Sequence, residues 1–106
     1  MKKTTIDLSV FWESAAKHNV EEREEERRHI EAVLNQALAG VSAVSWSGMA
    51  VRGIHHIRVG CTLGLSFLDA GGNVLANVSL LMSSRLVLRT WPDDGGLLEI
   101  AAEDDG

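Results

Sequence analysis

Tyrosine is absent from this 106-residue sequence, which holds two phenylalanines, one proline and one cysteine, Cys61. A single cysteine excludes an internal disulfide, so we expect the protein to work in the reducing cytoplasm. If both residues lie on one strand, His55 is six residues, or about 20 Å, from Cys61, too far to deprotonate the thiol. We therefore expect Cys61 to be a buried structural thiol.

Long apolar runs are also missing. The longest, residues 74–82, is interrupted by Asn77 and Ser79 and falls far short of the ~20 residues of a membrane-spanning helix. Asp7 and Glu13 interrupt the apolar region that a signal peptide would need. The sequence thus predicts neither a membrane span nor a secretory leader.

The common catalytic and metal-binding motifs do not occur in the sequence. There is no nucleophile elbow, Walker loop, dinucleotide fingerprint, C-x-x-C or H-x-x-x-H pattern. His55 and His56 are adjacent, and neighbours on a strand point to opposite faces, so they would not share one metal there. We therefore expect no catalytic residue, no metal and no cofactor.

Charge is plentiful but unevenly distributed. The net charge is −5; residues 21–40 hold six Glu against three Arg, and residues 93–106 hold six acids and no base. Residues 41–92 hold four Arg against one Asp. The overall negative charge and the scarcity of aromatic residues argue against direct binding to nucleic acid or to an anionic membrane.

A helix is predicted over residues 20–39. Asn19 can cap its first turn, with Glu22 three residues further on, and Gly40 follows the last turn. The second half carries one apolar stripe, whereas the first half is polar all round and should project into solvent. The stripe consists of Ile30, Val33, Leu34, Ala37 and Leu38.

After residue 40 the apolar side chains recur every second residue, which predicts strands. Residues 69–73, with Gly71 and Gly72, form the strongest turn signal and predict a hairpin. Further strands are expected near residues 86–91 and 97–101, and another turn at residues 92–96. The expected core positions are Met49, Val51, Ile57, Val59, Cys61, Leu63, Leu65 and Phe67 before the hairpin, and Val74, Ala76, Val78, Leu80 and Met82 after it.

The sequence as a whole predicts one α+β domain over residues 1–102 and a frayed acidic tail at 103–106. One main helix, of about residues 20–39, should pack on an antiparallel sheet of four to six strands, in two layers. Residues 4–12 alternate as in a strand, but a short helix beginning near Ser9 is the alternative.

Candidate binding residues come from the charged and aromatic side chains. Even spacing would place Arg52, His56 and Arg58 on the sheet face opposite the core, with Arg85 and Arg89 nearby if the later strands join the same sheet. Trp91, at a strand end, is a candidate interface anchor. The acidic start of the helix adds Glu21, Glu22 and Glu25.

Three functional hypotheses follow. The first is a non-enzymatic interaction protein, such as a regulator, inhibitor or assembly factor, that binds another protein or a second copy of itself. The alternative is a ligand-binding domain or enzyme with a pocket between helix and sheet, near His29, His55 and Trp91. The second alternative is an acidic mimic of nucleic acid that blocks a DNA- or RNA-binding protein.

Overall fold

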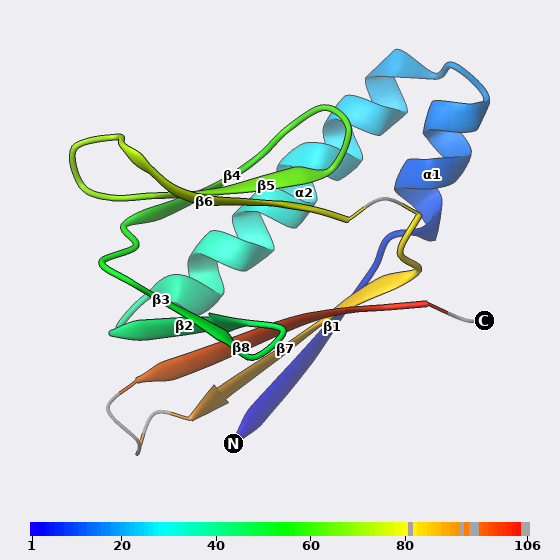
Figure 1. Ribbon diagram of the computed structural model, residues 1–106. Coiled ribbons are helices and arrows are strands. Elements are labelled where there is room, and N and C mark those ends of the chain that lie inside the picture. Colours follow the sequence, from blue (N-terminus) through cyan, green and yellow to red (C-terminus); the bar gives the residue numbers. More distant parts are fainter. Residues whose placement is uncertain (81, 92, 94–95, 105–106) are drawn as a thin grey trace.

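The computed structural model describes residues 1–80, 82–91, 93 and 96–104. These described residues form two helices and eight strands, arranged as in Figure 1, and the α+β prediction is confirmed. The elements are β1 (Lys2–Asp7), α1 (Ser9–Ala16), α2 (Val20–Leu38), β2 (Ala43–Trp46), β3 (Met49–Arg52), β4 (His56–Val59), β5 (Gly64–Leu68), β6 (Val74–Ser79), β7 (Arg85–Trp91) and β8 (Leu97–Glu103).

The strands form two sheets, so the prediction of one antiparallel sheet with four to six strands is wrong. Sheet A has the order β1-β7-β8-β2-β3, and sheet B has the order β4-β5-β6. Sheet A is mixed. β2 and β8 pair in parallel, whereas the pairs β1–β7, β7–β8 and β2–β3 are antiparallel. The chain leaves sheet A after Gly53, whose φ of +80° favours glycine, and begins sheet B at His56.

The main helix, α2, is close to its predicted bounds. Asn19 Oδ1 accepts a hydrogen bond from the Glu22 N–H at 3.2 Å, as expected of a helix N-cap. Ile30, Leu34 and Leu38 are its buried residues, and all three belong to the predicted stripe.

The predicted fold had one main helix, and the structure adds α1, the short helix beginning at Ser9 that was the alternative for residues 4–12. Residues 4–12, for which a strand and a short helix were the alternatives, contain part of each: β1 ends at Asp7 and α1 begins at Ser9. The division follows from a local hydrogen bond, because Asp7 Oδ1 accepts from the Ser9 N–H at 2.9 Å. The same bond lowers the pKa of the Asp7 carboxyl.

The hydrophobic core lies where sheet A meets α2 and sheet B. In Figure 1 sheet A lies at the bottom, and α2 and sheet B lie above it. The buried cluster combines side chains from all three parts of the fold. It includes Leu86, Leu88, Leu98 and Ile100 from sheet A, Ile30, Leu34 and Leu38 from α2, and Ile57, Val59, Leu65 and Phe67 from sheet B.

Four expected core positions are exposed. Met49, the first residue of β3, is 51% exposed. Cys61 lies in the turn between β4 and β5, where Leu63 takes the buried position instead. Val74, at the start of β6, is 48% exposed, and Met82 is 68% exposed. Met82 lies beyond β6 with φ at +58°, so the regular alternation has ended before it is reached.

Two further expectations fall partly outside the described residues. The predicted turn at 92–96 includes residues 92, 94 and 95, and the predicted tail includes 105 and 106, which the structure does not describe. Glu103 is the last residue of β8. Among the described helices, none is long and apolar enough to cross a membrane.

Candidate functional site

Each of the two sheets ends in two outer strands: β1 and β3 in sheet A, and β4 and β6 in sheet B. An outer strand has one row of backbone N–H and C=O groups without a neighbouring strand, and such a row can pair with another chain. Whether each of these four edges is covered, charged or open therefore indicates where a partner can bind.

The edge of β4 is covered by side chains of α2. Asn35 accepts from the Ile57 N–H at 2.9 Å and donates to the Ile57 carbonyl at 2.8 Å. Glu31 accepts from the Val59 N–H at 3.0 Å, and Arg27 donates to the Val59 carbonyl at 2.8 Å. The helix thus takes the place of a neighbouring strand along β4.

This arrangement was missed in the sequence, although a signal exists. Arg27, Glu31 and Asn35 recur every four residues and so form a polar stripe on one face of the helix. Arg27 also bonds Glu24, and this bond holds the pKa of the Glu24 carboxyl below its usual range. The polar half of α2 is therefore partly a structural surface rather than a purely solvated one.

The edge of β1 carries charge and faces α2 across a groove. Lys2, Lys3 and Asp7 give a six-residue strand three charged side chains. Charged residues, lysine above all, discourage edge-to-edge pairing. The charges on β1 therefore protect its edge from pairing with a strand of another chain.

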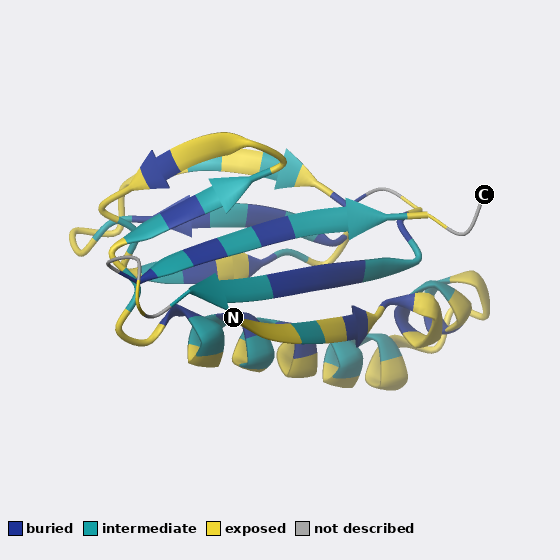
Figure 2. Ribbon diagram, turned by 90° about the horizontal axis from the view of Figure 1, so that it is seen from below, coloured by how far each residue is buried: buried dark blue, intermediate teal, exposed yellow. Residues whose placement is uncertain are grey.

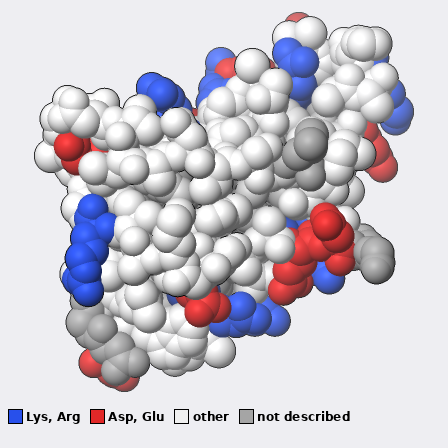
Figure 3. Space-filling model, in the orientation of Figure 1, with Lys and Arg blue, Asp and Glu red and all other residues white. Residues whose placement is uncertain are grey.

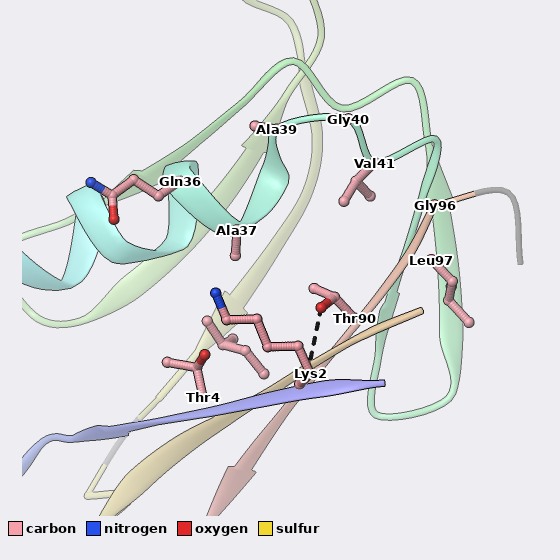
Figure 4. Close-up of a pocket in the computed structure, with 11 residues that line it drawn as sticks. Lys2, Thr4, Gln36, Ala37, Ala39, Gly40, Val41, Thr90, Gly96 and Leu97 are labelled. Carbon is pink, nitrogen blue, oxygen red and sulfur yellow. Dashed lines mark hydrogen bonds between the residues drawn. The ribbon is translucent and has the colours of Figure 1, made fainter. Parts of the chain in front are cut away.

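A small cavity opens between β1 and the C-terminal end of α2. It measures about 240 Å³, and in Figure 4 the Lys2 side chain reaches toward Ala37 across its opening. Thr90 Oγ1 donates to the Lys2 carbonyl at 3.5 Å. His29, His55 and Trp91, the side chains expected around a pocket, are not among those that line it.

The remaining two edges, β3 and β6, lie at the same side of the molecule, and Figure 2 shows β6 behind β3 there. Large apolar side chains are exposed on both strands: Met49 at 51%, Val74 at 48% and Leu75 at 41%. Figure 3 shows the same side, with a broad uncharged area in its middle and charged groups around its rim. We call this surface, formed by β3 and β6, the edge face.

On β6 the backbone of Asn77 points away from the sheet. The Leu80 N–H donates to the Leu63 carbonyl at 3.1 Å, which continues the β5–β6 ladder. Backbone groups alternate between the two sides of an antiparallel strand, so the N–H and C=O of Asn77 face the open edge. The Ser66 hydroxyl donates to Asn77 Oδ1 at 2.7 Å, and this contact orients the Asn77 amide.

The residues singled out in the sequence are distributed over several surfaces. Arg52 lies in sheet A, whereas His56 and Arg58 lie in sheet B, so the three do not share the face of one sheet. The exit of the chain from sheet A after Gly53 separates them. His56 Nε2 lies 3.8 Å from Glu31 Oε1, at the α2 side of sheet B.

Arg89 and Trp91 lie with Arg52 on the outer face of sheet A. The register links Trp91 through Leu97 and Ala43 to Arg52 in one cross-strand row. Arg89 pairs with Glu99 at 3.3 Å, and Arg85 pairs with Glu103 at 3.0 Å. The exposed acids Glu21, Glu22 and Glu25 lie at the start of α2, on a different element.

A function for this chain has to be inferred from its own side chains and strand edges. On the edge face, exposed apolar groups occur together with β6, an outer strand without charged residues. No family model matches the chain, and no curated protein or solved structure matches it.

Proposed function

We propose that this chain is a non-enzymatic interaction protein that binds another protein through the edge face. One observation carries the proposal: Met49, Val74 and Leu75 are exposed on β3 and β6, the two outer strands of the edge face. Exposed apolar groups surrounded by polar and charged ones are typical of protein-binding surfaces. A role as regulator, inhibitor or assembly factor fits such a surface.

Backbone as well as side chains can contribute to this binding. Partners often add an extended segment to an open sheet edge, where main-chain hydrogen bonds supply affinity and side-chain contacts supply specificity. The edge of β6 offers the outward-facing backbone of Asn77 next to the apolar side chain of Leu75. Arg52 lies at the end of β3, where it can serve as a cation at the rim.

The place of action that we propose is the cytoplasm. Cys61 is a free cysteine exposed to solvent. An exposed thiol stays reduced under cytoplasmic conditions and is prone to oxidation outside them.

The alternative of a ligand pocket has weaker support. The cavity beside Lys2 measures about 240 Å³, whereas pockets for small molecules commonly measure about 300–1,000 Å³. Of the three side chains proposed for the pocket, His29 borders a separate groove with Glu26 and Val33, which measures about 410 Å³ and so falls within that range. His55 and Trp91 are not among the residues that line this groove, so the three proposed side chains do not meet in it. Mimicry of nucleic acid would depend on Glu21, Glu22 and Glu25, which are exposed at the start of α2, together with the acidic tail at residues 103–106.

Binding through the edge face can be tested with two matched variants. The double variant Met49→Lys/Leu75→Lys adds charge to the face, and Val20→Lys makes the same change at an exposed apolar residue at the start of α2. Proteins retained from a native lysate are identified by mass spectrometry, and their binding is then measured with purified components. We expect the double variant to lose the partner and Val20→Lys to keep it. A partner held equally well by the double variant would contradict the proposal.

A further inference from the structure

The four outer strands differ in how well they are protected. Side chains of α2 cover β4, the charges of Lys2, Lys3 and Asp7 guard β1, and β3 has four residues and ends in Arg52. β6 has six residues, Val74–Ser79, without a charge or a proline. Natural sheets protect their edges with such devices, so an unprotected edge indicates a strand that is paired in use.

One irregularity occurs on β6, and it leaves most of the edge available. The register shifts between Phe67 and Leu68, so Leu75 is an extra residue on β6. Beyond this bulge Asn77 pairs regularly with Ser66. The regular part of β6 therefore presents the backbone of Asn77 to a further strand.

The lack of charge on β6 favours a second copy of the same chain as that strand. Identical strands bring identical charges together, which costs free energy when the strand is charged. The acids of this chain are concentrated elsewhere, in residues 21–31 and 93–105, and β6 has none. A twofold axis at Asn77 would place this residue opposite Asn77 of the second copy, with Ala76 opposite Val78 and Leu75 opposite Ser79.

We propose that β6 pairs antiparallel with β6 of a second copy, which joins two copies of sheet B into one six-stranded sheet. The inference rests on the proposed function, since it names a partner for the edge face. At the axis, the N–H and C=O of each Asn77 bond those of the other copy, and the two side-chain amides lie side by side. The bulge residue Leu75, 41% exposed in one copy, is covered by the other. A closed twofold contact of this kind is the commonest symmetry of protein oligomers.

The mass in solution tests the proposal directly. We expect light scattering and sedimentation to report a dimer for the natural chain, and Asn77→Lys to reduce the mass about twofold by placing two cations at the axis. Thr5→Lys is the control, because Thr5 is an exposed residue in the middle of the other long edge, β1. It should leave the dimer intact. Circular dichroism establishes that each variant is folded, and Leu75→Lys provides a second exposed site on β6 if Asn77→Lys does not fold.

A cross-link provides a positive result. Directly opposed residues of a hydrogen-bonded antiparallel pair have Cα atoms about 5.5 Å apart, within the range of a disulfide. In a Cys61→Ser background, Asn77→Cys should form a covalent dimer on mild oxidation, whereas Thr5→Cys should not. Covalent dimers from both variants at equal rates would overturn the proposal.

The outcomes also separate this proposal from the proposed function. A natural chain that is monomeric at all concentrations overturns the dimer, and so does a dimer that survives Asn77→Lys. If the monomer still retains another protein that Met49→Lys/Leu75→Lys loses, the edge face binds proteins but the partner is not a second copy. If the dimer forms through β6 and no other protein is retained, the dimer stands and the binding of another protein fails.

Discussion

Replacing the partly buried Asn35 with alanine should lower the stability of the fold strongly. The Asn35 amide bonds both the N–H and the C=O of Ile57, and Ile57 is fully buried. A buried backbone group that loses its partner costs about 1–3 kcal/mol, and partial access of water to this helix–strand boundary favours the lower half of that range for each group. Alanine gains about 0.6 kcal/mol of helix propensity over asparagine. The expected net loss in the free energy of unfolding is about 2 kcal/mol.

Urea denaturation followed by circular dichroism measures this loss. For a domain of this size we expect the thermal midpoint to fall by roughly 10 °C, because about 1 kcal/mol shifts it by some 4–8 °C. Gln36→Ala is the matched control, since Gln36 is the next residue on α2, is exposed and carries the same amide group. That variant should gain a few tenths of a kcal/mol from helix propensity. If Asn35→Ala and Gln36→Ala have equal stabilities, the α2 side chains do not replace a strand along β4.

Two further predictions concern a close backbone approach and an acid-sensitive hydrogen bond just before α1. Gly96→Ala should lower the free energy of unfolding by at least about 2 kcal/mol, because the φ of Gly96 is +75° and an added Cβ would lie 2.6 Å from the Gly40 carbonyl oxygen. The control Gly48→Ala, with φ at +87° and open space around it, should lower it by about 1 kcal/mol. Equal urea midpoints for these two variants would contradict the contact with Gly40. The Asp7 pKa is lowered below its ordinary 3.8 by the Ser9 N–H, so the stability from this bond is fully present above pH 3.8 and is lost as the pH falls through the lower folded-state pKa. Asp7→Asn should make the free energy of unfolding less sensitive to pH in this acidic window. An unchanged pH profile would show that Asp7 does not contribute to the acid sensitivity.

Local features of the fold could be predicted from the sequence because their signals are local. Asn19 and Gly40 bracket α2, and both features act within one helical turn. The hairpin at residues 69–73 depends on Asp69, whose carboxylate accepts from the N–H groups of Gly71 and Asn73, both at 2.9 Å. The bond from Asn73 also lowers the pKa of Asp69. In both cases neighbouring residues decide the backbone conformation.

The division into two sheets could not be predicted, because alternation specifies the faces of a strand and not its neighbours. The odd-numbered apolar pattern continues from Val51 in sheet A to Ile57 in sheet B without a break in phase. The parallel pairing of β2 with β8 joins segments about fifty residues apart. Cys61 fitted the alternation by number, but it lies in a turn where the pattern no longer applies.

The candidate site could not be predicted from the sequence for a related reason. Charged and aromatic side chains such as Arg58 and Trp91 are visible in a sequence, whereas an open strand edge consists of backbone that every residue carries. The informative signal on β6 is the lack of charge, and most segments of six residues in a core lack charge as well. It acquires meaning once the strand order shows β6 at an edge, beside edges that carry Lys2 and Lys3 or are covered by Asn35. An interaction surface of this kind is therefore defined by topology first and by residue type second, which is why the decisive test changes the charge of Asn77 rather than removing a charge that already exists.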